Sequence, residues 1–278
     1  MKLAMFDDGA GPQSGVVIGD EIAPTGVAGT MLDIIAQWSS TESRVKHAAE
    51  TAARAPLSKV KLLAPVARPG KIFAIGLNYA DHIAESKMEK PQTQVWFTKA
   101  ATSINGPFDP IQIATDSAHV DYEVELVAII GKRGRYITKA QAPSYVFGYC
   151  VGNDVTERMW QHRTQQWSLG KSFDTHAPIG PWITTADEVG DPHALGLRCF
   201  VNGEKRQDSN TKHLVFDIWD QIEHLSYAMT LEPGDLIFTG TPGGVGAAMD
   251  PRQFLSEGDV VRCEVDGLGA IEATLASA

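Results

Sequence analysis

The alternation of apolar and polar positions predicts a small N-terminal unit of strands followed by helices. Residues 2–6 and 15–22 are short strand-like runs, and the Gly, Pro and Asp residues between them are typical of a hairpin. Thr30 is placed to cap a helix over 31–40, and a second, Ala-rich helix is expected over 42–54. Two prolines and a glycine then indicate a connector, so we divide the chain into domains 1–66 and 67–278.

The larger unit, residues 67–278, reads as a mainly β domain with some α-helix. Short β-rich runs recur between Gly and Pro turns from residue 71 to the C-terminal region. Clear helical periodicity is limited to residues 216–229. The sequence contains neither the glycine fingerprint of a dinucleotide-binding fold nor a P-loop, and it has no internal repeat.

Composition and charge narrow the possible partners. The 278 residues include 24 Lys and Arg against 34 Asp and Glu, a formal net charge of −10, which disfavours nucleic-acid binding. No apolar run approaches the ~20 residues needed to span a bilayer, so we expect no membrane partner. Three widely separated cysteines and no signal-peptide pattern are typical of a reducing compartment, and we expect a cytoplasmic protein.

Carboxylates around residue 123 are the main candidates for chemistry. Glu123 and Glu125 are two apart, so in a strand they share a face, and Asp154 follows another apolar run. Clustered carboxylates favour a hard cation such as Mg²⁺, Mn²⁺ or Ca²⁺ over zinc. If a helical turn starts near Asp154, then Arg158 and Gln161 lie along its face. The competing interpretations are an exposed acidic strand edge for the glutamates and a helix N-cap for Asp154.

A second candidate is the pair His82 and Glu85 in the segment GLNYADHIAES. Their spacing of three allows a hydrogen bond on a short helix, and a His oriented by a carboxylate is a general-base arrangement. A solvated surface helix has the same pattern, and Asp81 is a rival partner for the imidazole.

Two loops have the composition of ligand-binding segments. Lys171 lies between small residues in a stretch rich in Gly and Pro, where it could reach a carboxylate or an enolate. The Gly-rich turn 238–246 offers backbone N–H groups and the hydroxyl of Thr241 to an anion, although an ordinary tight turn is the alternative. Lys99, after another predicted strand, is similarly ambiguous.

Taken together and in order, these segments resemble the fumarylacetoacetate hydrolase family. The resemblance spans about residues 70–270, and no single segment is specific alone. It implies a fold of rolled, mixed β-sheets with a small N-terminal α+β domain, assembled as a homodimer. It also implies that Mg²⁺ or Mn²⁺ is held by Glu123, Glu125 and Asp154. The segments that carry it are GLNYADHIAE, WFTKAATSINGP, DYEVELVAIIG, GYCVGNDVTERMWQ, LGKSFDTHAPIGPW and the long tract from LRCFVNG to FTGTPGGVG.

The resemblance also implies roles for individual residues. His82 with Glu85 would activate water, and Lys171 would stabilise enolate charge. Arg158, Gln161 and Thr241 would contact a small keto-acid substrate. The chain departs from the larger fumarylacetoacetate hydrolase at Gly76–Leu77–Asn78, where that enzyme has an additional aspartate ligand.

Because of this departure, the chain resembles the branch of smaller enzymes: acylpyruvases, oxaloacetate decarboxylases and diketo-sugar-acid hydrolases. We expect a metal-dependent hydrolase that cleaves the C–C bond of a 2,4-dioxo acid, either an acylpyruvate or a 2,4-diketo-3-deoxy sugar acid, to pyruvate and a carboxylic acid. An oxaloacetate decarboxylase, or a 2-hydroxy-diene-dioate isomerase or decarboxylase, would use the same enolate and is the enzymatic alternative. A β-rich binding domain is the non-enzymatic one. We further expect residues 76–91, which carry His82, to act as a mobile lid.

Overall fold

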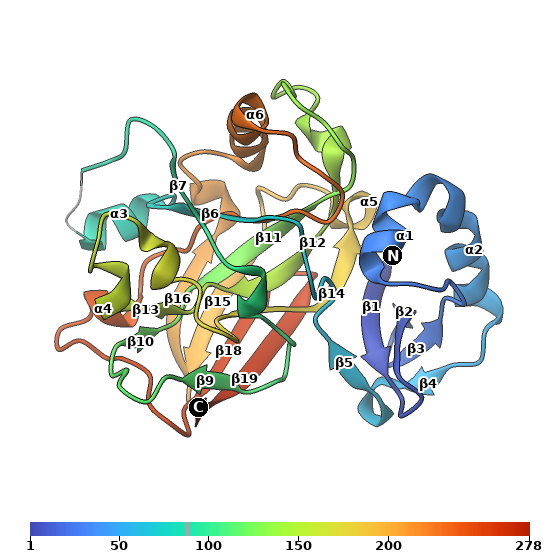
Figure 1. The fold of residues 1–278 in the computed structure, drawn as a ribbon, viewed down its shortest axis with the longest axis horizontal. Helices are drawn as coiled ribbons and strands as arrows, with labels where there is room; N and C mark the ends of the chain where they lie inside the picture. Colours follow the sequence, from blue (N-terminus) through green and yellow to red (C-terminus); the bar gives the residue numbers. More distant parts are fainter. Residues whose placement is uncertain (87–88) are drawn as a thin grey trace.

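A large mixed sheet organises the molecule (Figure 1). The structure is a computed structural model that describes residues 1–86 and 89–278. Within that part, twelve strands form the sheet. In spatial order they are β4 (Ala55–Pro56), β3 (Glu21–Pro24), β2 (Pro12–Ile18), β1 (Lys2–Asp7), β14 (Ala177–Thr185), β12 (Val146–Asn153), β11 (Val124–Ile130), β17 (Leu236–Phe238), β6 (Ile72–Gly76) and β7 (Val95–Thr98), with β5 (Lys61–Leu63) beside β1 and β8 (Ile104–Asn105) beside β14.

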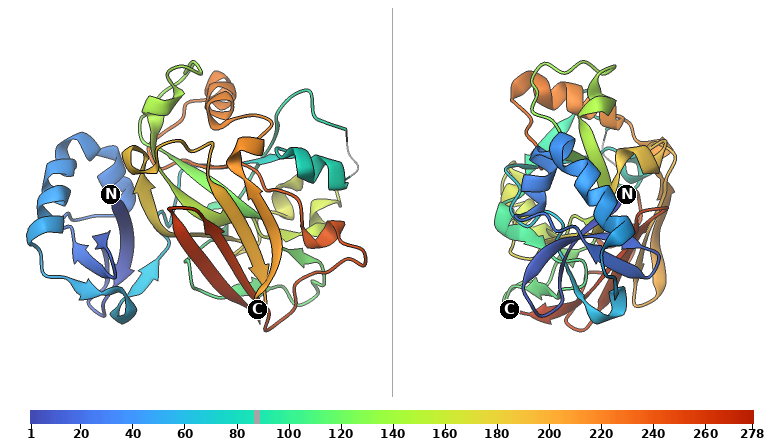
Figure 2. Two further views of the ribbon diagram at one scale, coloured as in Figure 1. Left: turned by 180° about the vertical axis from the view of Figure 1, so that it is seen from behind. Right: turned by 90° about the vertical axis from the view of Figure 1, so that its right-hand side faces the viewer.

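A second sheet lies against the large one (Figure 2). Its order is β16 (Glu204–Asn210), β15 (Gly196–Val201), β18 (Val260–Val265), β19 (Gly269–Ser277) and β9 (Ile111–Ile113), and β10 (Val120–Asp121) pairs separately with β13 (Thr156–Glu157). The α-helices are α1 (Met31–Ala36), α2 (Trp38–Thr51), α3 (Ala80–Ser86), α4 (Arg158–Gln161), α5 (Ala186–Val189) and α6 (Ile218–Ala228). Short 3₁₀ turns are η1 (Leu57–Lys59), η2 (Ala101–Ser103), η3 (Ala142–Tyr145), η4 (Trp167–Leu169), η5 (Thr211–His213) and η6 (Gly246–Ala248).

Strand β11 shows why the core has two sides. All seven of its residues are buried, as expected for a central strand covered on both faces. Val124, Leu126 and alternate residues join the cluster that faces the second sheet, while Val127 and Ile129 join the cluster containing α1. Period-two alternation therefore assigns the odd-numbered side chains of this segment, Glu123 and Glu125 among them, to one face.

The N-terminal unit matches the predicted elements with two corrections (blue in Figure 1). The run 15–22 is not one strand, because a turn at Gly19, with φ of +58°, separates β2 from β3. Thr30 caps α1 as predicted, but that helix ends at Ala36, and Gln37 alone separates it from α2, which starts at Trp38. This break lets Ile34 in α1 and residues of α2 reach one core cluster.

The predicted boundary at residue 66 does not coincide with a break in the sheet. Strand β1 pairs with β14, with Lys2 opposite Thr184, so the sheet runs through both units. The division into 1–66 and 67–278 stays a prediction. So does the lid, because residues 87 and 88 of that segment lie outside the described residues.

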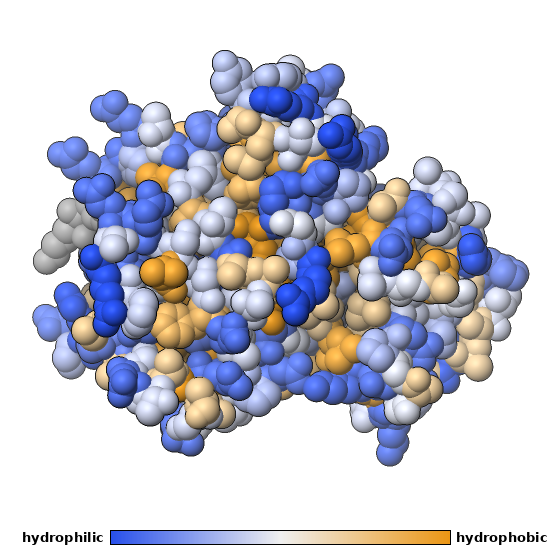
Figure 3. Space-filling view, viewed as in Figure 1, coloured by the Kyte–Doolittle hydropathy of each residue, from blue (hydrophilic) through white to orange (hydrophobic). Residues whose placement is uncertain are grey.

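The face of the molecule in Figure 3 has no large apolar patch. Charged and polar residues are scattered over it, and the apolar patches between them are small. Among the described residues, no helix is long and apolar enough to cross a membrane.

Candidate active site

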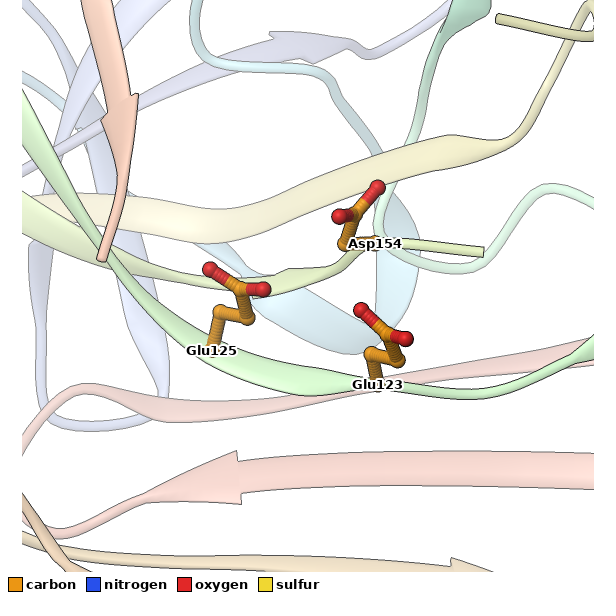
Figure 4. A group of neighbouring side chains, drawn as sticks. All are labelled: Glu123, Glu125 and Asp154. Carbon is orange, nitrogen blue, oxygen red and sulfur yellow. The ribbon is translucent and has the colours of Figure 1, made fainter. Parts of the chain in front are cut away.

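Strand pairing brings three carboxylates together at one end of the central sheet. Glu125 is in β11, Glu123 directly precedes that strand, and Asp154 directly follows β12, its antiparallel neighbour. The backbone N–H of Asp154 donates to the carbonyl of Glu123 at 2.9 Å, which fixes the two segments side by side. One oxygen of each carboxylate lies within 4.8 Å of the others, and all three residues are buried (Figure 4).

Buried cations compensate two of these carboxylates. The ammonium of Lys171 lies 2.7 Å from Glu123 and 2.6 Å from Asp154, and that of Lys99 lies 2.6 Å from the other oxygen of Asp154. Arg158 adds a contact of 2.7 Å to Glu123. Burial alone would raise the pKa of Glu123, but the charges of Lys171 and Arg158 outweigh it and lower that pKa. Glu123 is therefore held ionised.

Glu125 is different, because it forms no ion pair with any residue that the structure describes. Its carboxylate accepts a hydrogen bond of 2.6 Å from the backbone N–H of Gly240. Burial, followed by the charges of Asp154 and Glu123, raises the pKa of Glu125 well above its ordinary value. A buried carboxylate in this position needs a proton or another cation. The oxygen donors of Glu123, Glu125 and Asp154 fit a hard divalent ion such as Mg²⁺ or Mn²⁺.

The imidazole of His82 is oriented by Glu85, both on α3. Nδ1 of His82 lies 2.8 Å from Oε1 of Glu85, and Oε2 of Glu85 accepts the backbone N–H of Gly244 at 2.8 Å. The rival Asp81 instead accepts the backbone N–H of His82 at 2.8 Å and the hydroxyl of Ser209 at 3.3 Å. The ring therefore pairs with Glu85, and this assigns the Nδ1 proton to that bond and leaves Nε2 free to accept a proton.

Arg158 and Gln161 lie on α4, but Asp154 does not cap that helix. Glu157 is the N-cap, with its side chain accepting the N–H of Trp160, so the N-cap interpretation of Asp154 is wrong. Asp154 instead stays beside β11 because its side chain is held by buried lysines. Nη1 of Arg158 donates to the side-chain oxygen of Gln161 at 3.0 Å, which joins the two residues.

Thr241 lines the site with its hydroxyl engaged by the protein. That hydroxyl donates to the carbonyl of Val124 at 3.0 Å and accepts from Gln207 at 2.8 Å. Its hydrogen is thus committed to the backbone of β11, and an anionic ligand would meet the oxygen rather than a free donor. The geometry favours Thr241 as a support for the strand that carries Glu125.

These groups surround one cavity of about 890 Å³. His82, Glu85, Glu123, Lys171 and Arg158 all line it, together with Gln161 and Thr241. The cavity is large enough for a small organic acid, whose typical sites are ≈ 300–1,000 Å³. Glu125 and Asp154 do not line it and are buried beside Glu123.

Asp121 is a site residue that sequence reasoning missed. It is buried, pairs with Arg158 at 2.8 Å, and accepts the backbone N–H groups of Gly246 and Ala247 at 2.8 and 3.0 Å. The available signal was spacing, since Asp121 precedes Glu123 by the same two residues that separate Glu123 from Glu125. Lys99 was noticed without a role, and a buried Asp154 requires such a countercharge.

Comparison with known proteins assigns the family. The sequence profile described as "Fumarylacetoacetate (FAA) hydrolase C-terminal" matches residues 71–276. The chain belongs to the fumarylacetoacetate hydrolase family. The predicted membership is thereby confirmed, and so is the predicted fold.

Proteins similar to this chain are named for more than one class of reaction. The chain is 44% identical to the oxaloacetate tautomerase FAHD2A, mitochondrial, of Bos taurus over 94% of this chain and 84% of that protein. It is 37% identical to a fumarylacetoacetate hydrolase from Exiguobacterium antarcticum, with a TM-score of 0.91 and full coverage of both chains. A maleylpyruvate hydrolase from Sphingobium sp. SYK-6, in complex with manganese(II) and pyruvate, is 36% identical with a TM-score of 0.86, over 100% of this chain and 99% of that one.

Proposed function

We propose that this protein is a divalent-metal-dependent enzyme that enolises a 2-oxo acid, with keto–enol tautomerisation of oxaloacetate as its reaction. The observation that carries the proposal is the position of an oriented His82–Glu85 pair in the same cavity as Glu123, whose carboxylate lies within 4.8 Å of those of Glu125 and Asp154. The name of the bovine relative, an oxaloacetate tautomerase, supports this reaction over a hydrolysis.

In this proposal the metal site is formed by Glu123, Glu125 and Asp154. A bound Mg²⁺ or Mn²⁺ would act as a Lewis acid toward the carboxylate and 2-oxo oxygens of the substrate. The manganese(II) in the Sphingobium hydrolase supports a cation of this kind. Lys171 and Arg158 would keep Glu123 ionised, and Lys99 with Lys171 would do the same for Asp154.

His82 would move the proton. With its Nδ1 proton held by Glu85, Nε2 takes a proton from C3 of the substrate, and the electrons of that C–H bond form the C2–C3 double bond of the enolate. Returning the proton to the oxygen on C2 gives the enol. The ammonium of Lys171, which lines the cavity, stabilises negative charge as it develops.

Cleavage of a C–C bond in a 2,4-dioxo acid is the second candidate. The likeness to a maleylpyruvate hydrolase structure with pyruvate favours it. The same His82 would then take its proton from water, hydroxide would attack C4, and the departing fragment would be pyruvate enolate. Decarboxylation of oxaloacetate would also release this enolate, so the residues alone do not discriminate between these reactions.

A substrate panel separates the candidates. The protein is assayed with Mg²⁺ on oxaloacetate, for enol–keto conversion by ultraviolet absorbance and for pyruvate release, and on acetylpyruvate for pyruvate release. The proposal predicts fast interconversion of oxaloacetate without matching pyruvate release. Pyruvate release from acetylpyruvate at the greater catalytic efficiency would instead support the hydrolase, and absence of all three activities would contradict both.

Two further proposals concern the quaternary state and the cellular location. A homodimer is our proposal for the quaternary state, and light scattering at assay concentration measures it. We likewise propose a cytoplasmic location for this chain, whereas the name of the bovine relative places that protein in the mitochondrion.

A further inference from the structure

The side chains that line the cavity include more positive than negative groups, in a protein that is strongly acidic overall. Its lining includes four Arg and Lys residues against three carboxylates, whereas the whole chain has a formal net charge of −10. Two of those carboxylates are already engaged, Glu123 with Lys171 and Arg158, and Glu85 with His82. Cationic groups of the lining that remain without an acidic partner can attract anions into the cavity.

Two of the cavity's arginines take no part in the site described above. Arg163 follows α4, and Arg252 lies in the loop between η6 and β18. Within the described ranges, 1–86 and 89–278, neither guanidinium forms an ion pair. By contrast, Arg158 is paired with Asp121 and Glu123. Arg163 and Arg252 therefore keep their N–H groups available to a ligand.

A neighbour holds the side chain of Arg163, and a backbone hydrogen bond follows Arg252 directly along the chain. The guanidinium of Arg163 lies 4.1 Å from the ring centroid of Trp160, which in turn packs edge-on against Phe173. The residues after Arg252 are also fixed, since the backbone N–H of Gln253 donates to Gly246 at 3.0 Å. This anchoring reduces the conformational entropy that an arginine loses when it binds an anion.

Two histidines border the same part of the cavity. His119 and His162 line the cavity, and the ring of His119 packs edge-on against Phe254 at 4.8 Å. The buried Nδ1 of His119 has no hydrogen-bond partner in the described part of the chain. Burial, with the charges of Arg158 and Arg252, lowers the pKa of His162. The one acid of this loop that lines the cavity is Asp250.

We infer that Arg163 and Arg252 form a subsite for a second, distal carboxylate, so that the enzyme selects 2-oxo dicarboxylates over 2-oxo monocarboxylates. The inference rests on the proposed function, because the first carboxylate and the 2-oxo group would lie at the Glu123, Glu125 and Asp154 end. His119 and His162 border the subsite and supply further donors. Guanidinium groups suit this task, since they bind carboxylates through two parallel N–H bonds.

A matched pair of four-carbon acids tests the subsite. Oxaloacetate has a carboxylate where 2-oxobutanoate has a methyl group, and both can enolise at C3. The variants Arg252→Gln and Arg163→Gln should each reduce kcat/KM for oxaloacetate by about tenfold to a hundredfold, mainly through KM. Their kcat/KM for C3 deuterium exchange in 2-oxobutanoate should stay at the wild-type value.

The controls separate a subsite from a general loss of structure. Arg133→Gln removes an exposed arginine that does not line the cavity, and it should leave both substrates unaffected. Equal losses on both acids, or no loss on oxaloacetate in either variant, would overturn the inference. Wild-type activity on neither acid would count against the proposed function.

Equilibrium binding gives a second readout of the subsite. Calorimetry with oxaloacetate and 2-oxobutanoate on the Mg²⁺-loaded protein should show weakening by Arg252→Gln and Arg163→Gln for oxaloacetate alone. Equal weakening of both acids, or no weakening of oxaloacetate, would contradict the subsite.

Discussion

The floor and the rim of this cavity are built differently. The floor is the buried cluster of Glu123, Glu125, Asp154, Lys99 and Lys171, of which Glu123 and Lys171 line the cavity. Its carboxylates lie at the ends of paired central strands. The rim consists of His82 and Glu85 on the short helix α3, and of Arg163 and Arg252 in loops. Strand register fixes the floor, whereas short segments carry the rim. One cation site could therefore serve several reactions, with the rim choosing the substrate.

Neutralising Glu125, which has no cationic partner among the described residues, should have the largest effect on activity. Glu125→Gln keeps the shape of the side chain but deletes one proposed cation ligand, so we expect activity to fall to background and Mg²⁺ to stop raising Tm. Because Glu125 has no cationic partner among the described residues, the metal-free variant should be at least as stable as the metal-free wild type. Thermal unfolding with and without Mg²⁺ measures both effects.

The matched control for this variant is Glu272→Gln. Glu272 is a half-exposed glutamate whose nearest cation, Arg262, lies 3.6 Å away. It should retain activity and the Mg²⁺-dependent rise in Tm. Normal Mg²⁺ stabilisation in Glu125→Gln would exclude Glu125 as a ligand.

On the rim, His82→Ala should cost about 10²–10⁴-fold in kcat, the usual contribution of general-base catalysis. Mg²⁺ binding should survive, because His82 belongs to the rim and not to the floor. Glu85→Ala should cost less, and the double variant should be little worse than His82→Ala alone, since the two residues act as a unit. Steady-state kinetics and Mg²⁺ calorimetry give the two readouts. Additive losses, or a parallel loss of Mg²⁺ affinity, would refute this division of roles.

Within the floor, Asp154→Asn should affect stability in the opposite direction to Glu125→Gln. Asp154 is the shared partner of Lys99 and Lys171, so its neutralisation leaves buried positive charge uncompensated. We expect a loss of about 3–5 kcal/mol in the free energy of unfolding of the metal-free protein. Urea denaturation measures it. Equal stability of Asp154→Asn and Glu125→Gln would show that the ion pairs do not distinguish these two carboxylates.

Lowering the pH should reduce the free energy of unfolding through His176, which lies near Lys171. Burial is the main cause that lowers the pKa of His176 to about 4. Nδ1 of this ring has no hydrogen-bond partner in the described part of the chain. His176 stacks on Phe173, two residues after Lys171. Between pH 6.5 and 4 the unfolded chain binds this proton and the native protein does not, so stability falls as the pH falls, by up to about 3 kcal/mol.

Denaturation at pH 7 and pH 5 checks this contribution. The difference in the free energy of unfolding between the two pH values should shrink in His176→Gln and persist in His47→Gln, an exposed control. An unchanged difference in His176→Gln would assign the acid sensitivity to other groups.

The alternation of residues predicted much of the floor. The spacing of Glu123 and Glu125 implied one face, and the structure gathers both with Asp154. The sequence could not reveal that Glu157, rather than Asp154, is the N-cap of α4. Asp is the better N-cap by residue type, and only the buried lysines hold Asp154 elsewhere. The arginines of the rim were not predicted, because tertiary folding brings Arg163 and Arg252 to the same cavity and no local motif marks them.

The most direct test of the account is proton exchange at C3 of a 2-oxo acid. Deuterium incorporation into 2-oxobutanoate is followed by NMR in D₂O with wild-type protein, with and without Mg²⁺, and with His82→Ala, against the rate without protein. We predict that exchange requires both the cation and His82. Exchange that is equally fast after chelation of the metal, or unaffected by His82→Ala, would contradict the proposed mechanism.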